Sequence, residues 1–512
     1  MSQHQPEESA EEVQPYRIRV SSKYLDITRQ KLELTRLPHE PRSKDWWEPK
    51  TQVESLIDFW QESFSWRDRE EELNETLPQF RTNLQISTPP NSVRIHFIHA
   101  RSPHANAVPL LLIPPFPLTN LSLGHLVHPL SDPEDAGVTQ PFHVVIPALP
   151  GLGFSDSLPP NAPPISTTSK LLDDLMRRLG YEHYIGSNAG STSISPAGID
   201  WRLARHLSHH FSDSCLGFHF IAPPLASPTI SSSTSEWLKW KLARLLSSPV
   251  LGYSKDDLSA TQKRKMPQLS KKKSAINLGQ AANSNFEPNT PSYALCDSPT
   301  GLLLYVLKLL RTVSPKKELT QKDIITLTCL TWLPGPDAAM RYWAQCASEV
   351  EPVEEKRTTK KPKVAITVFT GEEDQAEQQT TLPRPAKTLY ACPAWANKEY
   401  QVVHLHRASG TPGFVALDRQ EVILDGVRGL AKSILANDKR MQVAEQPGAI
   451  LQNQLETQDG RPAQADLSGT TVQDPNASPS EGPSKSGPFK PIEDENHHLV
   501  PPQATAHRGA HS

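Results

Sequence analysis

Short apolar runs that do not alternate with polar residues recur through the first half of the chain. Each run is bounded by proline, glycine or a polar cluster, and segments of helical pattern separate them. The runs are PLLLI (109–113), FHVVI (142–146), HYIGS (183–187) and CLGFHFI (215–221). Runs of this kind are typical of strands buried on both faces of a parallel sheet, because a half-exposed strand would alternate. They therefore predict an α/β fold with an open, mostly parallel sheet.

The alternation of strands and helices breaks after Pro224 and resumes with KVAITVF (363–369) and YQVVHL (400–405). Between these points the pattern is long, mixed and mostly helical, and it contains a basic run, KKK, at 271–273. Such an interruption predicts a helical lid inserted at residues 225–320, followed by a helix of the core.

The composition of both ends differs from that of the core. Residues 15–83 place apolar groups among charges at helical spacing, and one amphipathic helix is predicted around residues 53–60. The last part is rich in Gln, Pro, Ser and Gly and has almost no apolar clusters. Such a segment cannot bury enough surface to offset the entropy of ordering, which predicts disorder. The predicted division is a disordered lead (1–14), an N-terminal wrapping domain (15–90), the first part of the core (91–224), the lid (225–320), the second part of the core (321–436) and a disordered tail (437–512).

Charge and cysteine usage exclude several classes of function. The formal net charge of −3 gives no reason to expect a nucleic-acid partner. The five cysteines are scattered and lack the spacing of metal ligands, so we expect buried thiols in a reducing compartment, with no metal and no cofactor. Neither a signal peptide nor an apolar window of ~18 residues is present, so we expect a cytoplasmic protein without a transmembrane helix. The oligomeric state stays open.

Two glycine-containing loops follow predicted strands. The first reads ALPGLGFS (148–155), and the second reads YIGSNAGS (184–191). The second has the small-x-nucleophile-x-small form of a nucleophile elbow, with Asn188 at its centre. Glycines flank that position because a Cβ there would clash with neighbouring backbone. The pattern therefore predicts that Asn188 stands on a strained strand-to-helix turn.

These two loops resemble those of microsomal-type epoxide hydrolases, in which they read close to SLPGFGFS and GGDWGS. Four further segments resemble the family in the same order along the chain. They are YRIRVSSKYLDITRQKLELTRLP (16–38), WRDREEELNETLPQF (66–80), YALCDSPTGLLLYVL (293–307) and GFVALDRQEVILDGVRGLA (413–431). The resemblance covers roughly residues 15–435. It implies an α/β-hydrolase fold in which residues 15–90 form the family's N-terminal domain.

The resemblance implies a two-step reaction, but three positions depart from it. In the family an Asp attacks the epoxide carbon to form an ester, a His activates water, and backbone amides of an HGxP loop hold the oxyanion. Here the nucleophile position holds Asn188, whose carboxamide is a very weak nucleophile. The base position holds Gly413 instead of histidine. Pro114 and Pro115 replace the His and Gly of the oxyanion loop, and proline has no N–H to donate.

Other positions are closer to the family pattern. Tyr342 matches one of the two tyrosines that protonate the opening epoxide, whereas Gln280 stands where the other belongs. Glu372 stands at the acid position, although it equally suits a solvated loop carboxylate. Phe116 and Ala189, beside the two altered loops, are expected to line the binding site.

Several nearby side chains are candidate substitutes. His404 and His406 lie at the end of the strand that precedes Gly413, although histidines there are more often surface residues. Asp200 is a tempting nucleophile, but a continuous helix from the elbow would place it roughly 18 Å away, so we expect a structural role such as an N-cap. Ser187 and Ser191 flank the apex, with no histidine expected to activate either.

Three functions follow as alternatives. The combined loss of nucleophile, base and oxyanion donors favours a pseudoenzyme that binds an apolar small molecule or an epoxide without turnover. The second is a divergent hydrolase that adds water to an epoxide to give a diol, including one in which Asn188 deamidates to aspartate. The third is a scaffolding role, in which the C-terminal tail carries the partner contacts.

Overall fold

The computed structural model describes eight stretches of the chain. They are residues 12–38, 50–87, 90–192, 195–263, 289–313, 319–349, 361–370 and 390–441. The predictions made for Gln280, Glu372, the run 271–273 and the tail from residue 442 onward lie outside these stretches.

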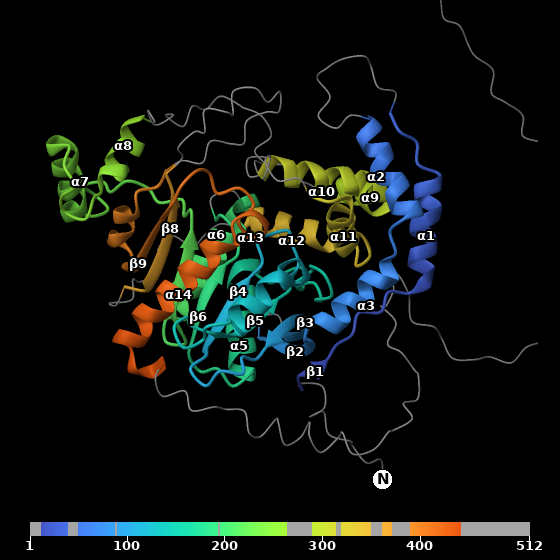
Figure 1. The fold of residues 1–512 in the computed structure, drawn as a ribbon, viewed down its shortest axis with the longest axis horizontal. Coiled ribbons are helices and arrows are strands. Elements are labelled where there is room, and N and C mark those ends of the chain that lie inside the picture. The colour runs from blue at the N-terminus through green and yellow to red at the C-terminus, as the bar shows by residue number, and fades with distance from the viewer. Residues whose placement is uncertain are drawn as a thin grey trace, which may run out of the picture. The chain divides into compact units, whose positions relative to one another are not determined.

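A mixed sheet of nine strands forms the centre of the described structure, in the order β1-β2-β3-β5-β4-β6-β7-β8-β9 (Figure 1). The strands are β1 (Gln14–Pro15), β2 (Gln79–Ser87), β3 (Pro90–Ala100), β4 (Val108–Ile113), β5 (Phe142–Pro147), β6 (Tyr184–Asn188), β7 (Cys215–Ile221), β8 (Lys363–Phe369) and β9 (Gln401–Ala408). Strands β1 to β3 pair antiparallel, and β3 pairs antiparallel with β5. The strands from β5 to β9 in this order run parallel. The predicted α/β class with a mostly parallel sheet is confirmed.

Strand β2 was not expected. The prediction of helical structure over residues 15–83 is wrong for the last residues of this range. Strand β2 begins at Gln79 and pairs with β3 along its whole length. Its buried residues Thr82, Leu84 and Ile86 alternate with more exposed ones, as in a strand with one solvated face.

Helices make up much of the remaining described structure. They are α1 (Ser22–Glu33), α2 (Lys50–Glu62), α3 (Trp66–Thr76), α4 (Val127–Ser131), α5 (Pro164–Arg178), α6 (Ile199–His210), α7 (Thr234–Leu246), α8 (Lys255–Lys263), α9 (Asn289–Asp297), α10 (Pro299–Val313), α11 (Gln321–Trp332), α12 (Asp337–Ser348), α13 (Val415–Asp418) and α14 (Gln420–Asn437). Short 3₁₀ helices are η2 (Asn120–Leu126), η3 (Pro196–Gly198), η5 (Pro393–Lys398) and η6 (Lys439–Met441). Helix α14 crosses strands β6 to β9 on one face (Figure 1), and α5 and α6 pack on the other.

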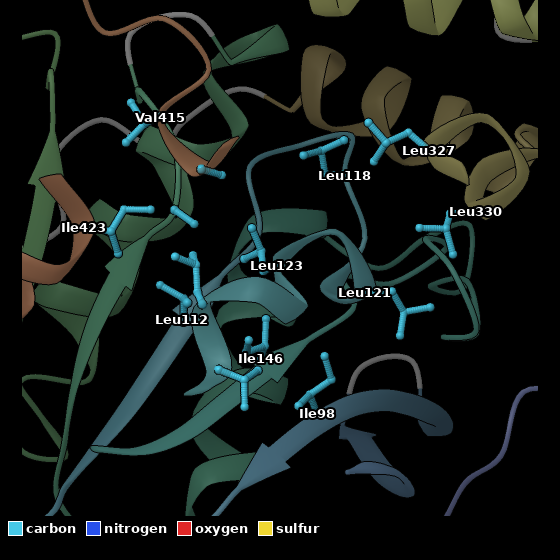
Figure 2. Close-up of a cluster of buried hydrophobic side chains, with 14 of the residues drawn as sticks. Ile98, Leu112, Leu118, Leu121, Leu123, Ile146, Leu327, Leu330, Val415 and Ile423 are labelled. Carbon is cyan, nitrogen blue, oxygen red and sulfur yellow. The ribbon is translucent and has the colours of Figure 1, made fainter. Parts of the chain in front are cut away.

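Strand β4 shows why the central strands are apolar throughout. Leu110 and Leu112 belong to the hydrophobic cluster on the α14 side, and Leu111 and Ile113 belong to the cluster on the α5 and α6 side. All four side chains are fully buried. Figure 2 shows part of the first cluster, which gathers side chains from the sheet, η2, α11, α13 and α14. Burial on both faces explains the runs without alternation.

The N-terminal helices wrap around helices from the later part of the chain. Helix α1 packs on α10, while α2 and α3 pack on α11. The indole N–H of Trp332 donates to the hydroxyl of Thr28 over 2.8 Å, and Lys31 forms an ion pair with Asp297. The N-terminal segment therefore shares the α14-side cluster instead of forming a separate core.

In the described stretches, no single helix is both long and apolar enough to cross a bilayer. One bent pair, Thr290–Asp297 with Pro299–Leu310, meets the length and composition test together, with an angle of 108° between its two parts.

Candidate functional site

The loop after β4 and the loop after β6, which were predicted to depart from the family pattern, leave the sheet next to each other at its carboxyl edge, which is where open α/β sheets bind ligands. Asn188 ends β6 and is the register partner of Ile113, which ends β4. The N–H of Ala189 donates to the carbonyl of Ile113 over 2.9 Å. The loop after β4 and the loop after β6 therefore start as neighbours.

Asn188 does not stand on a strained elbow. Its φ is outside the left-handed region, and it is the last residue of a regular strand. The expected sharp turn is wrong because the helix does not begin there: the chain continues through a loop and η3 before α6 starts at Ile199. The Asn188 side chain is fully buried, and neither its oxygen nor its nitrogen has a hydrogen-bond partner in the described part of the chain.

Gly186 and Gly190, which flank Asn188, each allow another residue to approach the backbone closely. The approaching atoms belong to side chains, whereas backbone atoms were expected. A Cβ on Gly186 would lie 2.5 Å from the ring of Phe218. A Cβ on Gly190 would lie 2.4 Å from the Cβ of Pro115. The ring of Pro115 thus occupies the space beside the loop after β6, which locks the two altered loops together.

The oxyanion loop has one backbone donor just after its two prolines, and that donor is in use. The N–H of Phe116 donates to Oδ1 of Asp200 over 3.1 Å. The amide of Ala189, on the other side of the edge, is taken by Ile113. The two amides nearest the expected oxyanion position are therefore satisfied within the protein.

Asp200 is the residue whose position departs most from expectation. The distance of roughly 18 Å assumed a continuous helix, but α6 starts only at Ile199, with Gly198 as its N-cap. Asp200 is therefore in the first turn of α6, where the helix dipole favours an anion. The break at Pro196 and Gly198 was the sequence signal that pointed to this course.

The carboxyl group of Asp200 lies in an apolar setting. The residue is 1% exposed, and its own N–H donates to the hydroxyl of Ser195 over 3.1 Å. Burial raises the pKa of Asp200 to about 7, and the hydrogen bonds from Phe116 and Ser195 oppose that rise. It is a buried carboxyl group placed directly against the oxyanion loop.

Tyr342 lies beside the same loop but its hydroxyl is engaged. The ring centroids of Tyr342 and Phe116 are 6.1 Å apart. The hydroxyl of Tyr342 shares a hydrogen bond of 3.0 Å with that of Thr168 on α5. Burial raises the pKa of Tyr342 well above its ordinary value. The structure thus brings Tyr342 and Phe116 together, while tying the phenol to the core.

Gly413, which was predicted to stand at the base position, is a constrained glycine. Gly413 has a φ of +56°, and a Cβ there would lie 3.1 Å from Oδ2 of Asp418. The same carboxylate oxygen accepts the N–H of Phe414 over 2.9 Å. A histidine at this position would need the left-handed conformation that L side chains rarely adopt.

The two histidines of β9 differ in their surroundings. The ring of His404 packs on α14, since a Cβ on Gly429 would lie 2.2 Å from its Nε2. Burial lowers the pKa of His404. His406 is half-buried, and its Nδ1 has no hydrogen-bond partner among the described residues. His404 therefore belongs to the packing of α14.

Ser187 does have a histidine, contrary to expectation. Its hydroxyl lies 3.0 Å from Nδ1 of His219, and Nε2 of His219 lies 2.9 Å from the hydroxyl of Thr367. All three residues are fully buried, and burial lowers the pKa of His219 to about 3. A Cβ on Gly426 would lie 2.0 Å from this imidazole, so α14 covers it closely. The network could not be predicted from the sequence, because Ser187, His219 and Thr367 are on three different strands.

The described residues contain no metal-binding cluster, and two of their cavities are lined by residues from other parts of the fold. No three His, Cys, Asp or Glu side chains within them lie close enough to share a metal. Two cavities of about 440 and 410 Å³ occur elsewhere, one lined by residues such as Lys363 and Arg440 and one by residues such as Lys170 and Arg178. Neither is lined by Asn188, Asp200 or Tyr342.

Comparison with known sequences points to a single family. The family described as "Epoxide hydrolase N terminus" matches residues 13–123. A Stigmatella aurantiaca protein named as an epoxide hydrolase is 28% identical over 352 residues, which is 66% of this chain and 70% of that protein. Epoxide hydrolase 1 of Sus scrofa is 24% identical over 348 residues, which is 64% of this chain and 70% of that protein.

Comparison with solved structures agrees on the fold. Aspergillus niger epoxide hydrolase is 19% identical, with a TM-score of 0.57 over 83% of this chain and 97% of that one. Juvenile hormone epoxide hydrolase of Bombyx mori is 19% identical, with a TM-score of 0.60 over 84% of this chain and 97% of that one. At this identity the likeness establishes the α/β-hydrolase fold, and the activity has to be argued from the site.

Proposed function

This chain belongs to the microsomal-type epoxide hydrolase family, and we propose that it uses the family fold to bind an apolar small molecule without carrying out epoxide hydrolysis. The observation that carries the proposal is the side chain of Asn188. Its amide is fully buried at the carboxyl edge and lacks a hydrogen-bond partner in the described stretches. Each buried polar group left unpaired costs about 1–3 kcal/mol, so a ligand that pairs this amide would gain affinity from it.

The chemistry of the edge supports binding over turnover. A carboxamide is a very weak nucleophile, and the amides of Ala189 and Phe116 are already engaged. No side chain projects from Gly413. The epoxide-hydrolase reaction needs a nucleophile, a base and donors for the developing charge, and each of these positions holds a residue unsuited to it.

The ligand chemistry follows from the same residues. Phe116 and the surrounding buried aliphatic side chains suit an apolar body. The Asn188 amide offers one acceptor and two donor hydrogens to a carbonyl, hydroxyl or epoxide oxygen. We therefore infer an apolar molecule with a single polar group directed toward Asn188.

Ligand binding and turnover can be measured on the same purified chain. Aryl and alkyl epoxides and the corresponding diols are screened by thermal shift, and diol formation is followed by chromatography. We expect some of these compounds to raise the Tm, with loss of the shift in Asn188→Leu, and no diol above the uncatalysed level. Diol formation by the unmodified protein would contradict the proposal, once peptide mass spectrometry has shown that Asn188 has not deamidated.

A divergent hydrolase is the second candidate, because Asp200 places a carboxyl group against the Phe116 N–H. In this scheme a carboxylate oxygen of Asp200 attacks an epoxide carbon, the C–O bond to that carbon breaks, and the alkoxide takes a proton. Water then cleaves the ester, which releases the diol and restores Asp200. Burial raises the pKa of Asp200 to about 7, so attack by the carboxylate would increase as pH rises through that value.

Covalent labelling tests this second candidate. The chain is incubated with excess epoxide above pH 7 and analysed by intact-protein and peptide mass spectrometry. An adduct on Asp200 that disappears in Asp200→Asn would favour the hydrolase, as would diol production lost in the same variant. Absence of both the adduct and the diol would remove it.

The scaffolding hypothesis concerns the tail beyond residue 441, which lies outside the described structure. It stays a prediction, as does the cytoplasmic location. A pull-down with the full chain and with a chain ending at residue 441 tests the tail directly. Partners lost only from the shorter chain would support scaffolding.

A further inference from the structure

Helix α7 carries an exposed apolar stripe. Leu238, Leu242 and Leu245 follow one another at helical spacing and therefore share one face. Their exposed fractions are 52%, 37% and 83%. Leu246 and Leu251 continue the apolar surface at the end of the helix, with 55% and 51% exposed. Soluble proteins scatter single apolar residues on their surface, whereas a contiguous patch marks an interaction site.

The opposite side of α7 is firmly attached to the fold. Trp240 and Ala243 are buried. The ring of Trp240 lies 5.2 Å from that of Tyr253 and meets the ring of Trp395 edge-on at 5.4 Å. Helix α7 also packs on η5. The leucine stripe is therefore the outward face of an anchored helix.

Positive charge accompanies the stripe. Lys241 and Arg244 are exposed on α7 and lie over tryptophan rings, at 5.8 Å and 5.6 Å from the ring centroids. The helix has one acidic residue, Glu236, which is paired with Lys239 over 2.8 Å. Farther along the chain, residues 263–273 contain six basic residues and no acidic one. The net charge of α7 itself is therefore positive.

We propose that α7 is a docking surface for an anionic lipid bilayer, in which the helix lies in the plane of the headgroups. A bilayer surface matches both parts of this face: acyl chains suit the leucines, and phosphate or carboxylate headgroups suit Lys241 and Arg244. The stripe is on a convex helix face, which suits a flat, deformable surface. The surface does not depend on the function proposed for the carboxyl edge.

Vesicle sedimentation tests the proposal with the full chain. Large vesicles of phosphatidylcholine alone are compared with vesicles that also contain phosphatidylserine. We expect binding to require phosphatidylserine and to weaken with added salt, because exposed charges are screened. Leu242→Glu combined with Leu245→Glu should weaken binding about tenfold or more, since it puts two charges into the apolar boundary.

Two further variants separate the contributions. Lys241→Gln with Arg244→Gln should reduce the preference for phosphatidylserine and the salt dependence. Leu34→Glu, at a leucine that is 84% exposed on a different helix end, should leave binding unchanged. All variants change exposed side chains, so unchanged unfolding curves confirm that each is folded.

The contrary outcomes are equally definite. Vesicle binding that the double leucine variant leaves intact would overturn the proposal, because it would show that another part of the chain binds the vesicles. Absence of vesicle binding, together with self-association that the double leucine variant abolishes in light scattering, would assign the stripe to a second copy of the chain.

Discussion

Two adjacent residues of β6 are buried to the same degree but are treated in opposite ways. Ser187 and Asn188 are both fully buried, and as successive strand residues they point to opposite faces of the sheet. Ser187 pairs with His219, which in turn pairs with Thr367. The side-chain amide of Asn188 has no hydrogen-bond partner within the described residues. The polar group of Ser187, which lies under α14, is therefore hydrogen-bonded, whereas within the described stretches the side-chain amide of Asn188 at the carboxyl edge is not.

The difference separates a structural polar network from a candidate binding group. Buried polar groups in folded proteins are almost always paired, because an unpaired one loses its water without compensation. The hydrogen bond between Ser187 and His219 shows that this fold can pair a buried polar group on the same strand. The unpaired amide of Asn188 is thus a local feature of the edge and is the part of the site most suited to a ligand.

The largest change in the free energy of unfolding is expected in the hydrogen-bonded network of Ser187, His219 and Thr367. His219→Ala removes the imidazole that joins Ser187 to Thr367 and leaves a cavity under α14. The free energy of unfolding should fall by about 4 kcal/mol, from lost packing and two unpaired hydroxyls. Urea denaturation measures it. A loss of under about 1 kcal/mol would show that the network is not structural.

At the edge, Asp200 should make stability depend on pH. Its pKa is raised to about 7 by burial, above the ~3.9 of an unfolded Asp, so the folded state binds more protons between these values. The free energy of unfolding should therefore fall as pH rises from about 4 to about 7, by up to about 1.4 kcal/mol per pH unit, and level off above.

Asp200→Asn provides the control for this pH effect. The variant has no titrating group at that position, so the fall between about pH 4 and pH 7 should be absent from its profile. Urea denaturation at a series of pH values compares the two proteins. Parallel profiles would mean that the Asp200 carboxyl group is solvated.

Asn188→Leu and Ser187→Ala should change the free energy of unfolding in opposite directions. Leu is close to Asn in size and has no polar group to leave unpaired, so the unfolding free energy should rise by about 1 kcal/mol in the absence of ligand. Ser187→Ala should lower it by about 1 kcal/mol, because it leaves His219 with one partner fewer. If both variants lose stability, Asn188 is paired in solution and the comparison fails.

An effect of no more than this size is expected at Tyr342. Tyr342→Phe loses the hydrogen bond to Thr168 and should lower the unfolding free energy by about 1 kcal/mol. Thr168→Val should have a similar effect on stability, and the double variant should add little to either. A loss of epoxide turnover in Tyr342→Phe that Thr168→Val does not share would instead assign the phenol to catalysis.

The sequence predicts the central strands well because their signal is local. KVAITVF (363–369) forms β8 over the same residues, since burial on both faces is recorded in each residue of the run. Strand β2 escapes prediction because its pairing with β3 and its one solvated face leave only a weak alternating pattern.

The candidate site was predictable only in part. The assignments of Asn188 to the nucleophile position and of Gly413 to the base position rest on motif position alone and stay predictions. The hydrogen bond from Phe116 to Asp200 depends on where α6 begins. The hydrogen bond between Ser187 and His219 joins residues that are 32 positions apart. Such contacts are set by tertiary packing, which no local window of sequence contains.

The late start of α6 has a consequence for anyone who would engineer this chain. The N-terminus of a helix is a source of positive potential, and in this fold it points at Asp200 and not at the end of β6. Asn188→Asp would therefore create a carboxylate without an electrostatic partner behind it. A working catalyst built on this scaffold has to shorten the segment 189–198 so that the dipole and the reacting group coincide, or else take Asp200 as its starting point.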